Sequence, residues 1–443
     1  MFARISLTAL LVFVFVAIAA AQSPPVVFRG AKIYPVSGAP IERGVLVIEN
    51  GKIKAVGAEG AVQIPAGARV EDVTGKVIIP GLVDTHSHVG IYPRPSVPAN
   101  QDGNETTGPV QPGLRAIDAI WPADPGIRMA LAGGITTANI MPGSGNVVGG
   151  QTAYVKLRGR TIEEMLIPGA IGGLKMANGE NPKGYGRRNL APQTRMMVAA
   201  LARRLYVRAQ EYRRKWQAYE AERAAGKADA KPPERDLELE PLVEVLEGKR
   251  IVQHHTHRAD DILTVLRLAE EFGFRVVIQH GTETYKVAAE LARRKIPVSL
   301  IVIDSPGGKH EAAEFTLAGA GILERAGVKV AIHTDDYINN SRFFLREAAL
   351  AVREGMSEEG ALKALTLHAA EMLDLAARVG SLEPGKDADF VILSGHPFRV
   401  RTQVLSTYIE GEKVFDRSLP GDLRYATGGF DVRERYPKLG GGR

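Results

Sequence analysis

The middle of the chain alternates short apolar runs with amphipathic segments, and this alternation limits the fold more than any other feature. Helical patterns such as 260–271 and 285–294 separate several of the runs. Strands that are apolar nearly throughout and alternate with helices indicate an α/β fold with a parallel sheet covered on both faces. The eight candidate strands favour a closed (β/α)₈ TIM barrel over an open sheet. They are residues 76–86, 134–141, 152–159, 169–177, 250–255, 275–280, 297–304 and 328–335.

Both flanks of this region have a different, β-rich texture. Residues 44–57 contain two strand-like runs joined by Asn50-Gly51, a pair typical of tight hairpin turns. Short strands and turn residues return near the other end. We therefore expect a small β-sandwich formed from both ends of the chain. In this division 26–79 and 376–420 form the sandwich, 80–375 the barrel, and 421–443 a C-terminal tail.

Residues 195–240 do not fit a minimal barrel. They contain a long charged helical pattern followed by the polar segment GKADAKPPERD. We expect a solvated helical insertion between the fourth and fifth strands. A lid, or a contact between copies of the chain in a homo-oligomer, is the alternative.

The first 21 residues have the pattern of a secretory signal peptide. Arg4 precedes an apolar stretch that ends in small residues before Gln22. The stretch is shorter than the roughly 20 apolar residues that span a bilayer, so a permanent anchor is the weaker reading. We expect a mature chain that begins near Gln22, has no membrane span and is periplasmic or extracellular.

Composition restricts the chemistry that is available. The chain of 443 residues has no cysteine, which excludes disulfides, thiolate metal ligands and a lipidated cysteine. Its formal net charge is +6, and it lacks a basic run with interleaved aromatics, so nucleic-acid binding is not expected. Any metal must be held by His, Asp, Glu or a modified Lys.

Histidines gather at the carboxyl ends of the predicted strands. Seven of the ten are found there, and barrel enzymes build their active sites on that face. Residues two apart in a strand face the same way, which pairs His86 with His88, His255 with His257, and His333 with Asp335. By the same rule His254 and Asp336 face away. Imidazole with carboxylate suits zinc, and also iron, manganese or nickel.

Several motifs resemble those of the amidohydrolase superfamily, in particular its imidazolonepropionase-like and peptidase-like branch. The resemblance covers nearly all of the chain after the signal sequence. It rests on PGLVDTHSHVG, GGITTANIMPGSGNVVGGQT, GLKMANGENPKGYG, HHTHRADDI, QHGTE, HTDDYINNSR and GSLEPGKDADFVILSGHPF, in that order. The family combines a β-sandwich and a (β/α)₈ barrel, in agreement with the expectation above.

The resemblance implies a metal site. His86, His88, His255, His280 and Asp335 match the metal ligands of the family. The expected cofactor is one or two divalent ions, with Zn²⁺ the first choice.

Other positions keep alternatives. Many relatives bridge two ions with a carboxylated lysine or a glutamate of the fourth strand, and Lys175 and Glu180 lie there. An unmodified Lys175 would instead face the substrate or have a structural role, and relatives with one ion need neither residue. His257 is a candidate substrate-binding or ligand-supporting residue. Arg342 is a candidate for binding a substrate carboxylate, or else it caps a helix.

The implied activity is metal-assisted hydrolysis of a carbon–nitrogen bond in a small amide, cyclic amide or dipeptide-like substrate. Asp335 would take the proton of the attacking water and return it to the leaving nitrogen. His280 or His257 would hydrogen-bond the developing oxyanion. The alternatives are a deaminase of a heterocycle, which usually carries a Glu beside a late-strand His that we do not find here, and a non-catalytic scaffold with a degenerate site.

Overall fold

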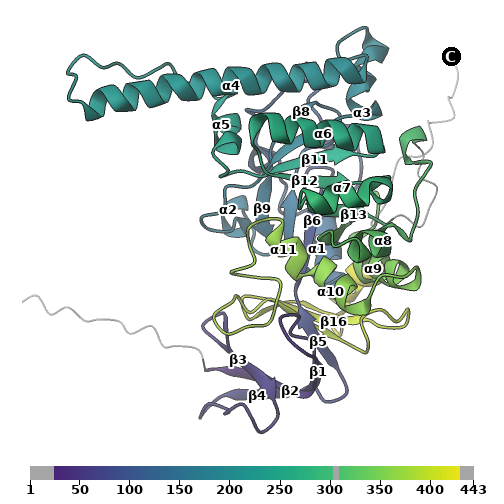
Figure 1. The fold of residues 1–443 in the computed structure, drawn as a ribbon. Coiled ribbons are helices and arrows are strands. Elements are labelled where there is room, and N and C mark those ends of the chain that lie inside the picture. Colours follow the sequence, from purple (N-terminus) through teal and green to yellow (C-terminus); the bar gives the residue numbers. More distant parts are fainter. Residues whose placement is uncertain (1–23, 303–308, 430–443) are drawn as a thin grey trace, which may run out of the picture.

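The computed structural model describes residues 24–302 and 309–429, and the chain adopts a mixed α/β fold (Figure 1). The predicted signal peptide and the final residues 430–443 of the predicted tail lie outside the described part. Within the described residues, no helix combines the length and the apolar character that a bilayer crossing requires.

The described strands form three sheets. The first contains β1 (Val26–Ile33), β2 (Ile41–Glu49), β3 (Lys52–Ala58), β4 (Arg69–Asp72), β5 (Val77–Pro80), β15 (Phe390–Leu393), β16 (Val404–Ile409) and β17 (Glu412–Asp416). The second contains β8 (Val148–Gln151), β10 (Leu174–Ala177), β11 (Val252–Thr256), β12 (Val276–His280), β13 (Val298–Ile301) and β14 (Val330–His333). The third contains β6 (Leu82–Ser87), β7 (Ile135–Ile140) and β9 (Ala153–Lys156).

The first sheet brings the two ends of the chain together. β5 pairs with β1 on one side and with β15 on the other. β2 and β3 form an antiparallel hairpin whose turn residues Asn50 and Gly51 have φ values of 52° and 73°. These left-handed conformations are those that an Asn-Gly turn requires.

The predicted first strand is divided at Gly81. β5 lies in the sheet shared by the chain ends, whereas β6 pairs with β7. A Cβ atom at Gly81 would stand only 2.3 Å from the Thr136 hydroxyl oxygen. The chain therefore passes between the sheets at a point where only glycine fits.

The expectation of eight parallel strands is wrong between β7 and β10. β10 to β14 are parallel, as are β6 and β7, but β9 runs antiparallel to β7 and β8 antiparallel to β10. β9 is the strand that pairs with β7, and the segment 141–152 between them contains the loop 141–147 and β8 but no helix, whereas a parallel connection usually crosses over through a helix. β8, which follows this loop, was not predicted.

Helices lie around the sheets in Figure 1. They are α1 (Pro125–Ala132), α2 (Ile162–Met165), α3 (Glu180–Lys183), α4 (Arg195–Ala224), α5 (Glu240–Leu246), α6 (Ala259–Phe272), α7 (Ala288–Arg293), α8 (Gly319–Arg325), α9 (Phe344–Arg353), α10 (Glu358–Leu365), α11 (Leu367–Glu371) and α12 (Pro420–Thr427).

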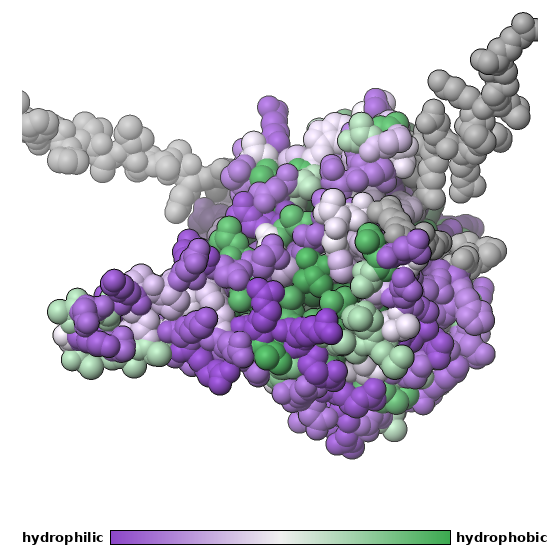
Figure 2. Space-filling model, turned by 90° about the horizontal axis from the view of Figure 1, so that it is seen from above, coloured by the Kyte–Doolittle hydropathy of each residue, from purple (hydrophilic) through white to green (hydrophobic). Residues whose placement is uncertain are grey.

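α4 is the long charged helix of the insertion. Thr194 caps its start by accepting a hydrogen bond from the Met197 amide. All its buried residues lie between Val198 and Tyr212, and Tyr206 stacks on Phe274 with ring centroids 4.8 Å apart. The remaining half extends from the body as a mostly hydrophilic arm (Figures 1 and 2).

The segment predicted as a C-terminal tail contains α12. Asp422 forms an ion pair of 2.5 Å with Arg128 of α1, and Arg128 also lies over the ring of Tyr425. The start of the predicted tail is therefore a helix packed on α1.

Candidate metal centre

His86, His88 and Asp335 meet where β6 and β14 end. One carboxylate oxygen of Asp335 lies 2.9 Å from His88 Nε2 and 3.4 Å from His86 Nε2. His86 and His88 are almost fully buried. Their other ring nitrogens are held by Gln279 and by the Met141 carbonyl, which sets the direction of each ring.

Lys175 of β10 reaches the same place. Its Nζ lies 2.9 Å from His86 Nε2 and 3.2 Å from the Met141 sulfur. Burial lowers the pKa of this amine to about 7, because the ammonium form loses its hydration. A large fraction of Lys175 is therefore neutral at neutral pH, which is the form that can be carboxylated.

His280 and His333 complete the side of the cluster formed by β12 and β14. His280 Nδ1 lies 3.8 Å from Asp335 and 3.4 Å from His333 Nε2, and His333 Nδ1 contacts the Ser299 hydroxyl. His86, His280 and His333 each offer a nitrogen within 4.8 Å of the others. His333 was not predicted as a ligand, although it shares a strand face with Asp335.

A neighbouring group contains His255 near the carboxyl end of β11, His257 just after that strand, and Glu311. One ligand atom of each lies within 4.8 Å of the others. Glu311 belongs to a short helical turn, His310–Ala312, and was not predicted. Glu180 is not part of this group: its carboxylate accepts a hydrogen bond from the Glu311 amide. The role suggested for Glu180 as a ligand beside Lys175 stays a prediction.

Burial dominates the electrostatics of these side chains. It lowers the pKa of His257 and of His333 to about 3, and holds those of His86, His255 and His280 well below the usual value. These five imidazoles are therefore neutral, as metal ligands must be. Burial also raises the pKa of Asp335, but the hydrogen bond with His88 and other neighbouring groups outweigh it, so the net shift is downward and the carboxylate stays ionised.

Several buried polar atoms in this region have no hydrogen-bond partner among the described residues. They are both ring nitrogens of His255, Nε2 of His257, Nε2 of His280 and one oxygen of Glu311. Unsatisfied buried groups are costly unless a ligand or water completes them. Converging nitrogen and carboxylate donors fit a divalent transition metal.

Two of the central residues have strained backbones. His280 has φ of 68° and Asp335 has φ of 50°, and both are non-glycine residues. Such conformations cost about 1–3 kcal/mol and cluster at functional sites. Each directs its side chain out of the strand end and into the cluster.

The residues expected to face away do so. Asp336 is buried against Arg94 and accepts hydrogen bonds from Ser341. His254 lines a pocket beneath α4 and α6, and its Nδ1 contacts the His255 carbonyl.

The structure does not direct Arg342 into the cluster. Its guanidinium donates to Asn340 and to the carbonyl of Gly428, which ties the chain after β14 to the end of α12. These contacts agree with a structural role, and the substrate-binding interpretation of Arg342 stays a prediction.

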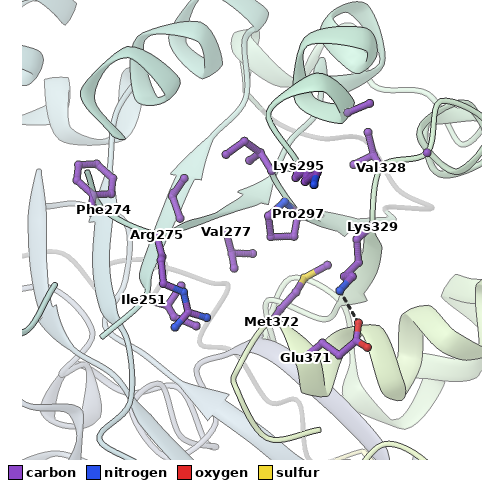
Figure 3. A pocket seen from close by; sticks show the side chains of 14 residues that line it. Ile251, Phe274, Arg275, Val277, Lys295, Pro297, Val328, Lys329, Glu371 and Met372 are labelled. Atoms are coloured by element: carbon purple, nitrogen blue, oxygen red, sulfur yellow. Dashed lines mark ion pairs between the residues drawn. The ribbon is translucent and has the colours of Figure 1, made fainter. Parts of the chain in front are cut away.

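The cavity in Figure 3 is separate from the histidine cluster. It has a volume of about 590 Å³ and includes an ion pair between Lys329 and Glu371. Its lining residues Ile251, Pro297 and Val328 stand at the amino ends of strands whose carboxyl ends carry the histidines. It therefore lies at the opposite end of the sheet.

Comparison with known proteins identifies the family. Residues 237–416 match the model of the amidohydrolase family. The crystal structure of an amidohydrolase from Thermotoga maritima is 41% identical, with a TM-score of 0.83, and the alignment covers 88% of this chain and all of that one. The chain belongs to the amidohydrolase family.

Curated relatives extend the comparison. The amidohydrolase TasK of Hapsidospora irregularis is 30% identical over 85% of this chain, but the chain spans only 39% of TasK. A 5-methylthioadenosine/S-adenosylhomocysteine deaminase of Symbiobacterium thermophilum is 23% identical, with 90% of each chain covered.

Proposed function

We propose that this protein is a metal-dependent hydrolase that cleaves a carbon–nitrogen bond in a small amide, cyclic amide or dipeptide-like molecule. The observation that carries the proposal is the convergence of His86, His88 and Asp335, with Lys175 and His280 beside them, from the ends of separate strands. Family membership supports the same reaction class.

The metal position is assigned to His86, His88 and Asp335, with His255, His280 and Lys175 on its other side. A divalent ion supplies Lewis acidity toward the scissile carbonyl and makes water a stronger acid. A carboxylated Lys175 would add an anionic oxygen and allow a second ion. Zn²⁺ is the ion that suits these donors best.

Asp335 is assigned as the proton carrier. Its side chain keeps 14% of its surface exposed, so substrate and water reach it, and its lowered pKa leaves it ready to accept a proton at neutral pH. It takes the proton of the attacking water and returns it to the leaving nitrogen. The Nε2 atom of His280 has no hydrogen-bond partner among the described residues and is available to hydrogen-bond the developing oxyanion.

Metal content and substrate profiling test the proposal together. Purified protein should contain divalent metal by mass spectrometry, and the double variant His86→Asn/His88→Asn should lose at least one ion while keeping its circular dichroism. His396→Asn is the matched control, because that histidine pairs with Glu358 on the surface. Unchanged metal content in the double variant would refute the ligand assignment.

Profiling of metal-loaded protein should cover amides, N-acyl amino acids, cyclic imides, dipeptides and aminated heterocycles. Hydrolysis of an amide or dipeptide is the expected result. If the only activity found is release of ammonia from a heterocycle, the deaminase alternative is favoured. The similarity to a deaminase is the reason to include these substrates. Metal-free, inactive protein with an intact fold would favour a scaffold.

A closed barrel carrying a satellite sandwich is part of the proposal. Backbone hydrogen bonds from Asp335 to His86 and from His88 to Asp336 link β6 to the end of β14. A bond from Thr152 to Gly173 links the start of β9 to β10. In the first sheet, β5 lies between β1, which carries Phe28, and β15, which carries Phe390. The centroids of the two rings are nevertheless only 5.0 Å apart, which supports a sheet that curls into a sandwich. Residues 80–375 would then form the barrel unit.

Export completes the proposal and rests on the signal-like first 21 residues. Protein isolated from its native host should begin near Gln22 and be found outside the cytoplasm. N-terminal sequencing of periplasmic and medium fractions tests this, and an intact Met1 on cytosolic protein would overturn it.

A further inference from the structure

We infer that His255, His257 and Glu311 form a second cation position, distinct from the position held by His86, His88 and Asp335. This inference rests on the proposed function and adds to it a ligand set that includes a carboxylate from the loop after β13. The three side chains come from the end of β11 and from the turn His310–Ala312. One ligand atom of each lies within 4.8 Å of the other two.

The donor atoms are buried and unsatisfied. His257 Nε2, one oxygen of Glu311 and both nitrogens of His255 have no hydrogen-bond partner in the described parts of the chain. The three residues have exposed fractions of 4% or less. Four buried polar atoms without partners inside one small region destabilise the folded chain, and a bound cation would offset that cost.

The supporting contacts aim these donors at one point. The Thr282 hydroxyl contacts His257 Nδ1 at 2.7 Å, which leaves Nε2 directed away from it. The second oxygen of Glu311 accepts hydrogen bonds from the Glu180 amide at 2.9 Å and from Arg195 at 3.3 Å. Outer contacts of this kind orient metal ligands in proteins.

Arg195 connects this position to the insertion. It is the first residue of α4, and it also pairs with Asp261 of α6 at 2.7 Å. The ion pair with Asp261 therefore fixes the position of the guanidinium that contacts Glu311. The start of α4 therefore helps to position the Glu311 carboxylate, in addition to covering the sheet.

The donor set selects the class of cation. Two neutral imidazoles and one carboxylate match Zn²⁺ and related first-row transition ions, whereas Mg²⁺ and Ca²⁺ prefer oxygen ligands. The two positions are close, because the ring of His255 lies 4.3 Å from that of His280, centroid to centroid. His255 can therefore serve either position, but His257 and Glu311 belong to the second alone.

Metal binding measured without any substrate tests the inference. Apoprotein, its Glu311→Gln and His257→Asn variants, and the His86→Asn/His88→Asn double variant are titrated with Zn²⁺ by calorimetry. Bound metal is counted by mass spectrometry, and Co²⁺ absorption spectra report the ligand environment. We expect Glu311→Gln and His257→Asn each to weaken Zn²⁺ binding at the second position at least 100-fold. Both variants should still bind the ion at the first position, which is the ion that the His86→Asn/His88→Asn double variant loses.

Two further variants sharpen the test. Glu180→Gln is the matched control, because Glu180 neighbours Glu311 but offers no atom to the group, and it should bind like the wild type. Arg195→Met should weaken the second class roughly 10–100-fold, as expected for loss of a supporting contact. Its Co²⁺ spectrum should change while the spectrum of Glu180→Gln does not.

The outcomes separate this inference from the proposed function. If the wild type and Glu311→Gln bind the same number of ions with equal affinity, the second position is refuted and the proposed hydrolase stands. If the wild type binds no metal at all, both are refuted. If Glu311→Gln does not fold, His257→Asn decides on the same criteria.

Discussion

Asp335 and Asp336 are adjacent in sequence, but their different surroundings indicate different roles. Asp335 has a positive φ that turns its carboxylate to His88, and part of its surface remains open. Asp336 is fully enclosed with Arg94 and Ser341. One carboxylate is therefore arranged for proton transfer, and the other holds the loop after β14 in place.

The two asparagine variants should separate these roles. Asp335→Asn should lose at least about 10²-fold in turnover with little change in thermal stability, because asparagine cannot accept and return a proton. Asp336→Asn should instead lose about 3 kcal/mol of stability, because it removes the buried carboxylate charge that faces the Arg94 guanidinium and accepts hydrogen bonds from Ser341. Turnover on any substrate found by profiling, with thermal melts of both variants, gives the comparison. An inactive but stable Asp336→Asn beside an active Asp335→Asn would reverse the assignment.

At the residue scale, strand alternation predicts the residues that end strands and misses those on loops. His86 with His88 and His255 with His257 could be placed because they follow recognisable apolar runs. Glu311 could not, because no strand or motif precedes it closely and its partners are far away in sequence. The resemblance offers Glu180 as a possible bridging ligand, but no local pattern indicates that its carboxylate accepts a hydrogen bond from the Glu311 backbone amide.

At the scale of elements, a buried charge cluster joins β9 to the segment before β15. The Lys156 ammonium lies 2.6 Å from Asp387 and 3.1 Å from Asp389, and all three side chains are buried. Asp387 also pairs with Lys52 and Arg378, whereas Lys156 is the only cation that pairs with Asp389 within the described part of the chain. The cluster therefore connects the inner strands to the sheet of the chain ends.

Lys156→Met should destabilise the protein by about 3–5 kcal/mol, because Asp389 would be left as a buried carboxylate without a counter-charge. A lower melting temperature in a thermal scan checks this. Lys54→Met is the control: it removes an exposed pair with Glu49 and should leave the melting temperature unchanged. Equal melting of both variants would mean that the cluster does not stabilise the junction.

Element existence was easier to predict than element pairing. The apolar runs locate β10 to β14 and β7 well, because a buried strand needs a continuous apolar stretch. The reversal at β8 and β9 depends on the segment 141–152, which connects β7 to its partner β9 without a crossover helix. The division at Gly81 depends on the approach of Thr136, which no local pattern encodes.

At the scale of the whole molecule, the histidine cluster ties distant strands to one point. His86 comes from β6, Lys175 from β10, His280 from β12, and Asp335 follows β14. Buried nitrogen and oxygen atoms at the centre of this arrangement have no hydrogen-bond partner in the part of the chain that the structure describes. A cation that binds only the folded chain should therefore stabilise the entire fold, and not only the residues that touch it.

Metal removal should accordingly lower the melting temperature. An ion present at 100 times its dissociation constant adds about 2.7 kcal/mol, which for a chain of this size corresponds to about 3–5 °C. The measurement compares chelated protein with the same sample reloaded with Zn²⁺, and Mg²⁺ at equal concentration should give a much smaller shift because it prefers oxygen ligands. His86→Asn/His88→Asn should lose the part of the response that comes from the first ion, whereas His396→Asn should respond like the wild type. If Zn²⁺ does not change the melting temperature of the wild type, the protein has no Zn²⁺ site that forms only in the folded state, because a ligand that prefers the native state must stabilise it.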